Sequence, residues 1–110
     1  MSADQESFVT LLIERLNDPE LTVRVYTGLR LGGMGVEAKS ALPALLDLQQ
    51  SEDVHNRRLA ALVLGSLGRD LAEAVPSLLN ALQDEDETVR RLAAEALEKI
   101  APARRRPKAA

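Results

Sequence analysis

At 110 residues the chain is long enough for one domain with a small core, and no apolar run approaches the roughly 18 residues that a membrane-spanning helix needs. It contains no cysteine, which excludes disulfides, thiolate metal ligands and cysteine nucleophiles, and its formal net charge is only −3. Phe8 and Tyr26 are the only aromatic residues, so the apolar content is almost wholly aliphatic, which favours closely packed helices over a β-sheet.

The first predicted element is an amphipathic helix that opens a unit spanning residues 6–35. Its apolar residues recur at i, i+3, i+4 and i+7, which places them on one helix face. They are Val9, Leu12, Ile13 and Leu16. Asp18 then stands where a side-chain oxygen can cap a second helix, and Gly35 suits the left-handed position at that helix's end. One side of the second helix carries Val23, Tyr26, Thr27, Arg30, Leu31 and Met34.

The same pattern starts again over residues 39–68. Its first helix carries Leu42, Leu45, Leu46 and the polar exception Gln49. Pro43 fits the first turn of that helix, where a missing N–H costs nothing. Ser51 takes the predicted capping position, and Gly68 takes the position at the end of the second helix.

A third unit spans residues 72–101, with Pro76 in the slot of the earlier proline. Asp84 is its predicted cap. Its two helix faces consist of Val75, Leu78, Leu79 and Leu82, then Val89, Leu92, Ala93, Ala96, Leu97 and Ile100. The four basic residues Arg104, Arg105, Arg106 and Lys108 follow, so the rest of the chain carries a net charge of −7. Residues 102–110 show no apolar periodicity, and we predict a disordered basic tail.

The three units repeat at a fixed interval of 33 residues, without a gap. Arg24, Arg57 and Arg90 keep this interval, as do the leucines at positions 31, 64 and 97. A single helix pair covers only one apolar stripe, so stability requires neighbouring units to stack, and about three units are the usual minimum. We therefore predict one repeat domain over residues 1–101.

The third unit carries a family resemblance most clearly. The turn Asp84-Glu85-Asp86 with Val89-Arg90-Arg91-Leu92-Ala93-Ala94 and Leu97, together with Ala74-Val75-Pro76-Ser77-Leu78-Leu79, resembles HEAT repeats. The pattern resembles especially the short HEAT-like type found in phycobilisome lyase-related bacterial proteins. The resemblance implies an all-α fold, an α-solenoid in which three HEAT-like helix-turn-helix repeats form a right-handed superhelix.

The resemblance also implies a ladder of aspartates and arginines along the stack. The residues in its slots are Asp18, Arg24, Ser51, Arg57, Asp84 and Arg90. Ser51 supplies no carboxylate and interrupts this ladder in the middle unit. Asn56, where the family prefers valine, is a second departure in the same unit. We expect the arginines to be structural and not an anion-binding row.

Candidate catalytic groups have structural explanations. Ser51 and His55 stand at i and i+4, but no carboxylate is placed to orient the histidine, which favours solvated helix residues over a nucleophile and base. One histidine beside Glu52 and Asp53 does not project three ligands to a metal ion. Gly32-Gly33-Met34-Gly35 follows a helix and not a strand, unlike a phosphate loop. The paired His-Glu motifs of HEAT-like hydroxylases are missing. We predict no catalytic residue, metal or cofactor.

One surface favours protein binding. In the first two units, the side of the second helices opposite the core is apolar where a simple amphipathic helix would be polar. The HEAT resemblance places these helices along a concave surface. We therefore predict a non-enzymatic scaffold or adaptor that binds a protein partner there. The predicted binding residues are Val25, Tyr26, Leu29, Arg58, Leu62 and Arg91. The alternative is that tight packing of the units buries these residues internally.

Other functions stay open. The resemblance alone suggests an accessory subunit of a bilin lyase or related enzyme. Phe8 and Leu11 occupy slots that hold small residues in the other units, so the chain could also form a homo-oligomer. The basic tail is a weak signal for nucleic acid, because four charges without aromatic neighbours follow an acidic body. The acidic start shows no secretory signal, and we predict a cytoplasmic protein without membrane contacts.

Overall fold

The structure is a computed structural model that describes residues 3–105, with side chains over residues 6–100. Over this range every regular element is helical. Helices pair along the chain as α1 (Ala3–Arg15) with α2 (Leu21–Gly32), α3 (Leu42–Gln49) with α4 (Val54–Leu67), and α5 (Val75–Ala81) with α6 (Glu87–Arg105). Two short 3₁₀ helices, η1 (Gly35–Ala41) and η2 (Ala72–Ala74), connect the pairs.

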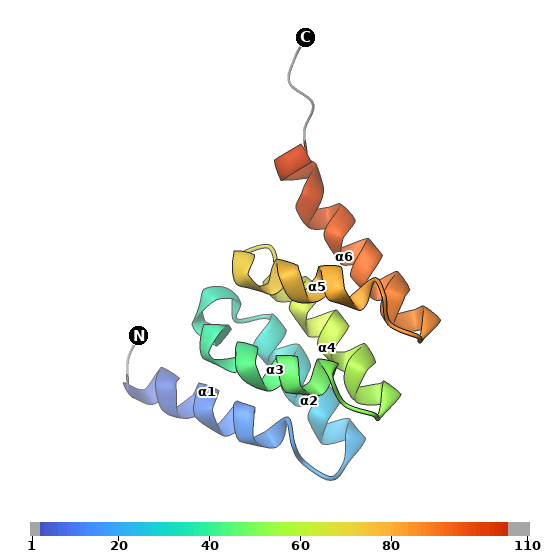
Figure 1. The fold of residues 1–110 in the computed structure, drawn as a ribbon. Helices are drawn as coiled ribbons and strands as arrows, with labels where there is room; N and C mark the ends of the chain where they lie inside the picture. Colours follow the sequence, from blue (N-terminus) through green and yellow to red (C-terminus); the bar gives the residue numbers. More distant parts are fainter. Residues whose placement is uncertain (1–2, 106–110) are drawn as a thin grey trace.

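The three helix pairs stack side by side (Figure 1). The first helices α1, α3 and α5 form one layer, and the second helices α2, α4 and α6 form the other. Leu12, Leu45 and Leu78 stand at equivalent positions of the three units, and all three are at most 5% exposed. Equivalent residues therefore have equivalent surroundings, and the predicted all-α repeat stack is confirmed.

Small residues allow the second helices to approach one another. A Cβ added at Gly28 would lie 2.9 Å from Leu59 Cδ1 across the α2–α4 contact. One added at Gly65 would lie 2.8 Å from the Cβ of Ala96 across the α4–α6 contact. Real Cβ atoms do not come this close, so a larger side chain at either glycine would push the helices apart. The spacing between units thus depends on these glycines.

The residues predicted to cap the second helices form hydrogen bonds within the turns and do not cap the helices. Asp18, Ser51 and Asp84 lie two residues before the helix caps, and each accepts a hydrogen bond from the backbone N–H two residues further on, at 2.9, 3.1 and 2.8 Å. Such a bond closes a turn. The caps are Asp53 and Asp86, whose carboxylates accept from a backbone N–H inside the following helix at 2.9 and 3.0 Å. The capping prediction was therefore wrong by two residues.

The two predicted helix-end glycines differ from each other. Gly35 has a φ of 60°, the only positive φ in the described chain, and it begins η1 after α2 has ended at Gly32. Gly68 follows α4 with a φ of −61°, so the left-handed conformation predicted for it is wrong. Its small size matters instead, because an added Cβ would lie 2.5 Å from Ile100 Cδ1.

Helix α6 continues to Arg105, four residues beyond the predicted end of the domain. Apart from Pro102, which has no N–H, each further helical residue can add a backbone hydrogen bond without needing an apolar side chain. Apolar periodicity reports burial and therefore misses such an extension. The rest of the predicted tail, residues 106–110, lies outside the described residues.

Candidate protein-binding surface

The repeated arginines hold the turn of their own unit. Arg24 Nη1 donates to the carbonyl oxygens of Asp18 and Pro19 at 2.8 and 3.0 Å. Arg57 Nη1 donates to the corresponding carbonyls in the second unit at 2.9 and 3.0 Å. Arg90 Nη1 donates to the Asp84 carbonyl at 2.7 Å. In each unit, one arginine side chain thus donates to backbone carbonyl groups of the turn.

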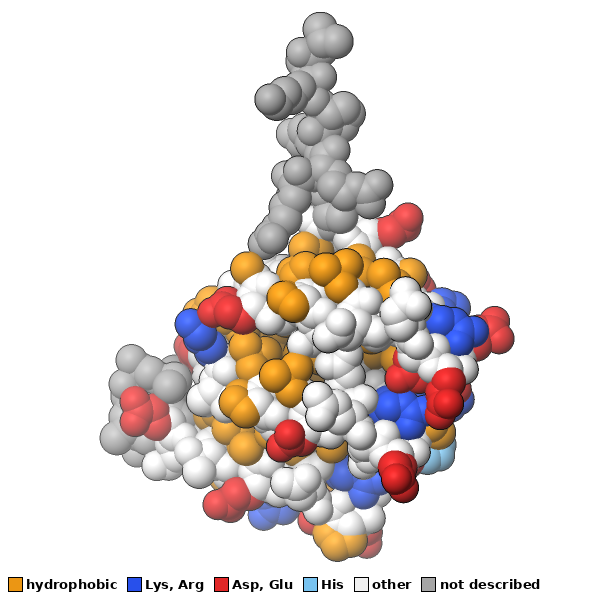
Figure 2. Space-filling view, in the orientation of Figure 1, with side chains coloured by type: hydrophobic (Ala, Val, Ile, Leu, Met, Phe, Trp, Pro, Cys, Tyr) orange, Lys and Arg blue, Asp and Glu red, His pale blue; other side chains and the backbone are white. Residues whose placement is uncertain are grey.

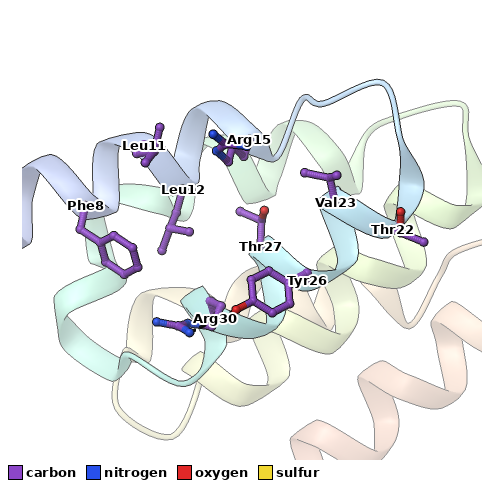
Figure 3. A pocket seen from close by; sticks show the side chains of 9 residues that line it. All are labelled: Phe8, Leu11, Leu12, Arg15, Thr22, Val23, Tyr26, Thr27 and Arg30. Atoms are coloured by element: carbon purple, nitrogen blue, oxygen red, sulfur yellow. Dashed lines mark hydrogen bonds between the residues drawn. The ribbon is translucent and has the colours of Figure 1, made fainter.

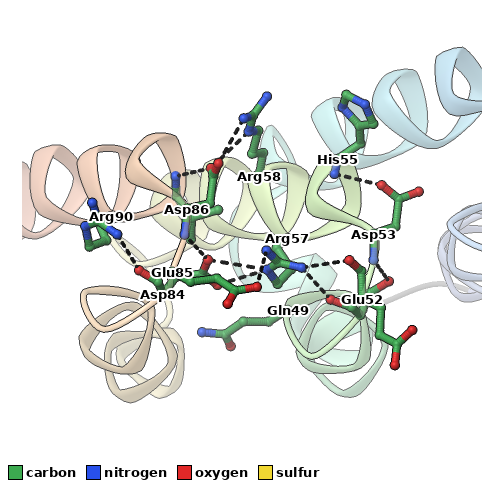
Figure 4. A network of polar contacts seen from close by, with 12 residues as sticks. Gln49, Glu52, Asp53, His55, Arg57, Arg58, Asp84, Glu85, Asp86 and Arg90 are labelled. Atoms are coloured by element: carbon green, nitrogen blue, oxygen red, sulfur yellow. Dashed lines mark hydrogen bonds and ion pairs between the residues drawn. The ribbon is translucent and has the colours of Figure 1, made fainter.

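The arginine of the second unit also reaches the third unit (Figure 4). Arg57 Nε donates to Asp84 Oδ2 at 3.0 Å, and the two side chains are only 12% and 11% exposed. Acidic and basic side chains gather along this edge of the molecule, where the turns lie, in the space-filling view (Figure 2). The contact joins adjacent units through a charge-assisted hydrogen bond that is shielded from water.

The corresponding contact between the first and second units is incomplete. Ser51 has no carboxylate, and within the described chain no group accepts a hydrogen bond from the buried Arg24 Nε. Arg24 Nη2 lies 3.7 Å from Asp53 Oδ2 instead. Ser51 Oγ accepts from Asn56 Nδ2 at 3.1 Å, and Asn56 Oδ1 is buried without a partner among the described residues. Ser51 and Asn56, the two residues of the middle unit that depart from the family pattern, are therefore in direct contact.

Both predicted binding arginines, Arg58 and Arg91, are bonded within the protein. Arg58 Nε and Nη2 donate to both carboxylate oxygens of Asp86, at 3.0 and 2.9 Å. This bidentate hydrogen bond is the main reason that the pKa of Asp86 falls to about 2. Arg91 pairs with Glu95 at 3.0 Å on the same helix, and both side chains are mostly exposed. A partner would have to compete with the first contact far more than with the second.

The structure separates the predicted apolar residues into three settings. Leu29 and Leu62 remain 52% and 41% exposed on α2 and α4. Val25 is half-buried against the core. Tyr26 is exposed at the outer end of the first unit, away from the neighbouring second helices. Packing between units buries Gly28 in the same stretch of α2. The alternative that the units bury this side of the second helices therefore holds for Gly28 but not for Leu29 and Leu62.

A hollow of about 630 Å³ lies between the C-terminal end of α2, the C-terminal half of α4 and the middle of α6. We call it the second-helix groove. Its lining is Gly32, Ala61, Leu62, Gly65, Ser66, Arg69, Asp70, Leu92, Glu95, Ala96 and Lys99. Small residues provide the depth, and charged side chains contribute to the lining. Of the predicted residues only Leu62 lies in it. The equivalent glycines 32 and 65 were the sequence signal that could have located the rest.

A second hollow, of about 530 Å³, lies on the outer side of the first unit between α1 and α2 (Figure 3). Phe8, Leu11 and Tyr26 line it together with Arg30. The guanidinium carbon of Arg30 lies 5.6 Å from the centre of the Phe8 ring and 6.0 Å from that of Tyr26. Arg30 Nη1 also donates to the Tyr26 hydroxyl at 3.3 Å. The arginine therefore joins the two aromatic rings.

Ser51 Oγ accepts hydrogen bonds from the backbone N–H of Asp53 in its own turn and from the side-chain amide of Asn56 in α4, and the His55 side chain is exposed. In the part of the chain that the structure describes, no three His, Cys, Asp or Glu side chains come together to hold a metal ion. No helix over those residues is long and apolar enough to cross a membrane.

Comparison with known proteins agrees with this geometry. A family model described as HEAT repeats matches residues 9–98. A search of curated proteins found no match. The finer likeness to phycobilisome lyase-type repeats stays a prediction.

Proposed function

The chain belongs to the HEAT-repeat family, and we propose that it is a non-enzymatic scaffold or adaptor that binds a protein partner on its second helices. Repeats of this family generally serve as protein-interaction scaffolds. The observation that supports the site is the second-helix groove with the exposed leucines Leu29 and Leu62 on the same helices. Residues of α2, α4 and α6 line the groove, so adjacent units contribute to it, as a partner segment longer than one helix turn requires.

Apolar burial supplies the affinity in this proposal. Full burial of an exposed leucine is worth about 1.5–3 kcal/mol, so covering the exposed half of each leucine contributes about 1 kcal/mol. Arg69 and Lys99 together with Asp70 and Glu95 place both charge signs around the groove. Charged residues at a rim affect orientation and association rate more than affinity. The partner is therefore a helix or extended segment with apolar residues at its centre and polar residues beside them.

The decisive variant pair is Leu29→Glu with Leu62→Glu. A matched control is Leu46→Glu with Leu79→Glu, because these leucines are 38% and 52% exposed on the first helices, the opposite layer. Proteins captured from the native cell by each variant are compared by quantitative mass spectrometry. The Leu29/Leu62 double variant should lose a partner that the wild type and the control both retain, with an unchanged melting temperature. Retention of every partner by this double variant, or its global unfolding, would contradict the proposal.

A further inference from the structure

The two ends of the stack expose positions that are buried between units inside it. At the first-unit end face, Tyr26 is 62% exposed, whereas Leu59 in the same slot of the second unit is 4% exposed. Phe8 and Arg30 are likewise exposed there, in slots that hold buried residues in the second unit. We define this face by Phe8, Leu11, Asp18, Glu20, Tyr26 and Arg30.

The third-unit end face shows the same effect from the other side. Leu31 and Leu64 are fully buried, but their equivalent Leu97 is only partly buried. Ala61 is 1% exposed, whereas Ala94 in the same slot is exposed. We define this face by Leu82, Arg90, Arg91, Ala94, Leu97 and Glu98. The two end faces are thus the two halves of the contact that adjacent units make inside the stack.

The inner contacts specify which residues of the two faces would meet. Across the contact between the second and third units, Arg57 bonds Asp84 and Arg58 bonds Asp86. At the two end faces, Arg90 occupies the position equivalent to Arg57, and Asp18 the position equivalent to Asp84. Arg91 is likewise equivalent to Arg58, and Glu20 to Asp86. Both pairs are of opposite charge.

A third contact extends the pattern. Gly65 faces Ala96 in the inner contact, and the corresponding slots at the ends hold Glu98 and Arg30. This pair is again of opposite charge. In the described part of the chain, neither Arg90 nor Asp18 nor Glu98 forms a salt bridge.

We propose that copies of this chain associate head to tail, with the third-unit end face of one copy on the first-unit end face of the next. Gln49 reaches the carbonyl oxygen of Ser77 at 2.6 Å in the inner contact, and these slots become Leu82 and Leu11 at the ends. Gly28 faces Leu59 inside, and these slots become Ala94 and Tyr26. Two apolar pairs therefore accompany the three charged pairs.

The end contact is looser than the inner ones. Glu98 occupies the slot of Gly32 and Gly65, where even an added Cβ would lie 3.2 and 2.8 Å from the neighbouring side chain. Helix α6 of one copy therefore stands further from α2 of the next than α4 does from α6. The contact is heterologous and does not close at a dimer, so the average mass keeps rising with protein concentration. It uses surfaces outside the second-helix groove and holds or fails independently of the proposed function.

The test is sedimentation equilibrium of the full chain from micromolar to millimolar concentration. The wild type should exceed the monomer mass progressively. Arg30→Glu alone and Glu98→Arg alone should each weaken association by on the order of tenfold, because each replaces an attractive pair with a repulsive one. The double charge swap in one chain should restore association. An equimolar mixture of the two single variants should restore it too, since each supplies the face that the other lacks.

Three outcomes would overturn the proposal. The first is a monomer at every concentration. The second is a double swap that stays as weak as the single variants. The third is sensitivity to Arg30→Glu without sensitivity to Glu98→Arg, which a symmetric contact between two first-unit end faces would produce. Circular dichroism melting checks the fold of each variant. If one of them unfolds, Glu20→Arg with Arg91→Glu applies the same charge-swap logic to a different pair.

Discussion

The incomplete contact between the first and second units can be repaired by substitution. The complete contact pairs Arg57 Nε with the Asp84 carboxylate, while Arg24 Nε has no partner among the described residues because Ser51 takes the place of the aspartate. The Oδ1 atom of the neighbouring Asn56 also has no partner among the described residues. The equivalent position in the third unit is the buried Val89. We therefore predict that Ser51→Asp combined with Asn56→Val stabilises the protein.

The magnitude follows from the groups involved. A buried polar atom without a partner costs about 1–3 kcal/mol, and a hydrogen bond to a charged group contributes about 1.5–3 kcal/mol. Desolvation of the new carboxylate and repulsion from the adjacent Glu52 and Asp53 offset part of this gain. The third unit tolerates the same acidic triplet, Asp84-Glu85-Asp86, around an equally buried arginine. We expect a net gain of about 2 kcal/mol, which raises the melting temperature by about 8 °C in a domain of this size.

Thermal and urea unfolding of the double variant provide the assay. A double-mutant cycle with Arg24→Met should assign most of the gain to the new ion pair, because the methionine variant cannot use the added carboxylate. The reverse exchange, Asp84→Ser with Val89→Asn, should lower the melting temperature by a similar amount. An unchanged or lower melting temperature for Ser51→Asp with Asn56→Val would refute the reasoning.

Three further predictions concern charge and packing. The pKa of Asp86 is about 2 in the folded protein and 3.8 for the free side chain, so its ion pair stabilises fully above pH 4 and loses this effect as the pH falls towards 2. Asp86→Asn should therefore flatten the decline of the urea midpoint between pH 4 and 2. Arg57→Ala should lower the free energy of unfolding by about 3–5 kcal/mol, because it leaves a buried carboxylate unpaired. Arg90→Ala removes an exposed side chain and should lower the free energy of unfolding by about 1 kcal/mol in the same urea titration. Gly65→Val should lower the free energy of unfolding by about 1–3 kcal/mol in melting experiments, because it forces α4 from α6. Gly33→Ala should raise it by about 0.4–1 kcal/mol, because the added Cβ makes only ordinary van der Waals contacts and φ is −82°.

The candidate site could be predicted only in part. Leu29 and Leu62 follow from the apolar pattern of the second helices, but the pattern alone does not distinguish a groove from an internal contact. Their exposure depends on how far α2 and α4 approach each other, and Gly28 controls that approach from the same stretch of helix. Arg58 was expected to face a partner, yet Asp86 from the next unit already binds it. The partner of a long side chain depends on the rotation between units, which one unit's sequence does not reveal.

The turns show the limit of local reasoning. An oxygen at position 18, 51 or 84 can bond a backbone N–H of the turn or one of the following helix, and both are within reach in the sequence. The backbone path selects the turn, and it moves the cap to Asp53 and Asp86.

The sequence by itself determined the repeat, the helix pairs and most of the core positions, because helix periodicity and turn-forming residues act over a few neighbouring residues and recur every 33 positions. Leu46 and Leu79 are exceptions, because they belong to the predicted apolar faces and are 38% and 52% exposed. The tertiary structure alone decided the depth of the second-helix groove, the partners of the arginines and which slots are left open at the two ends of the stack. These features depend on distances between units, and a fraction of an ångström at Gly28 or Gly65 changes them. Local patterns specify which residues face inward, while close packing specifies what they meet.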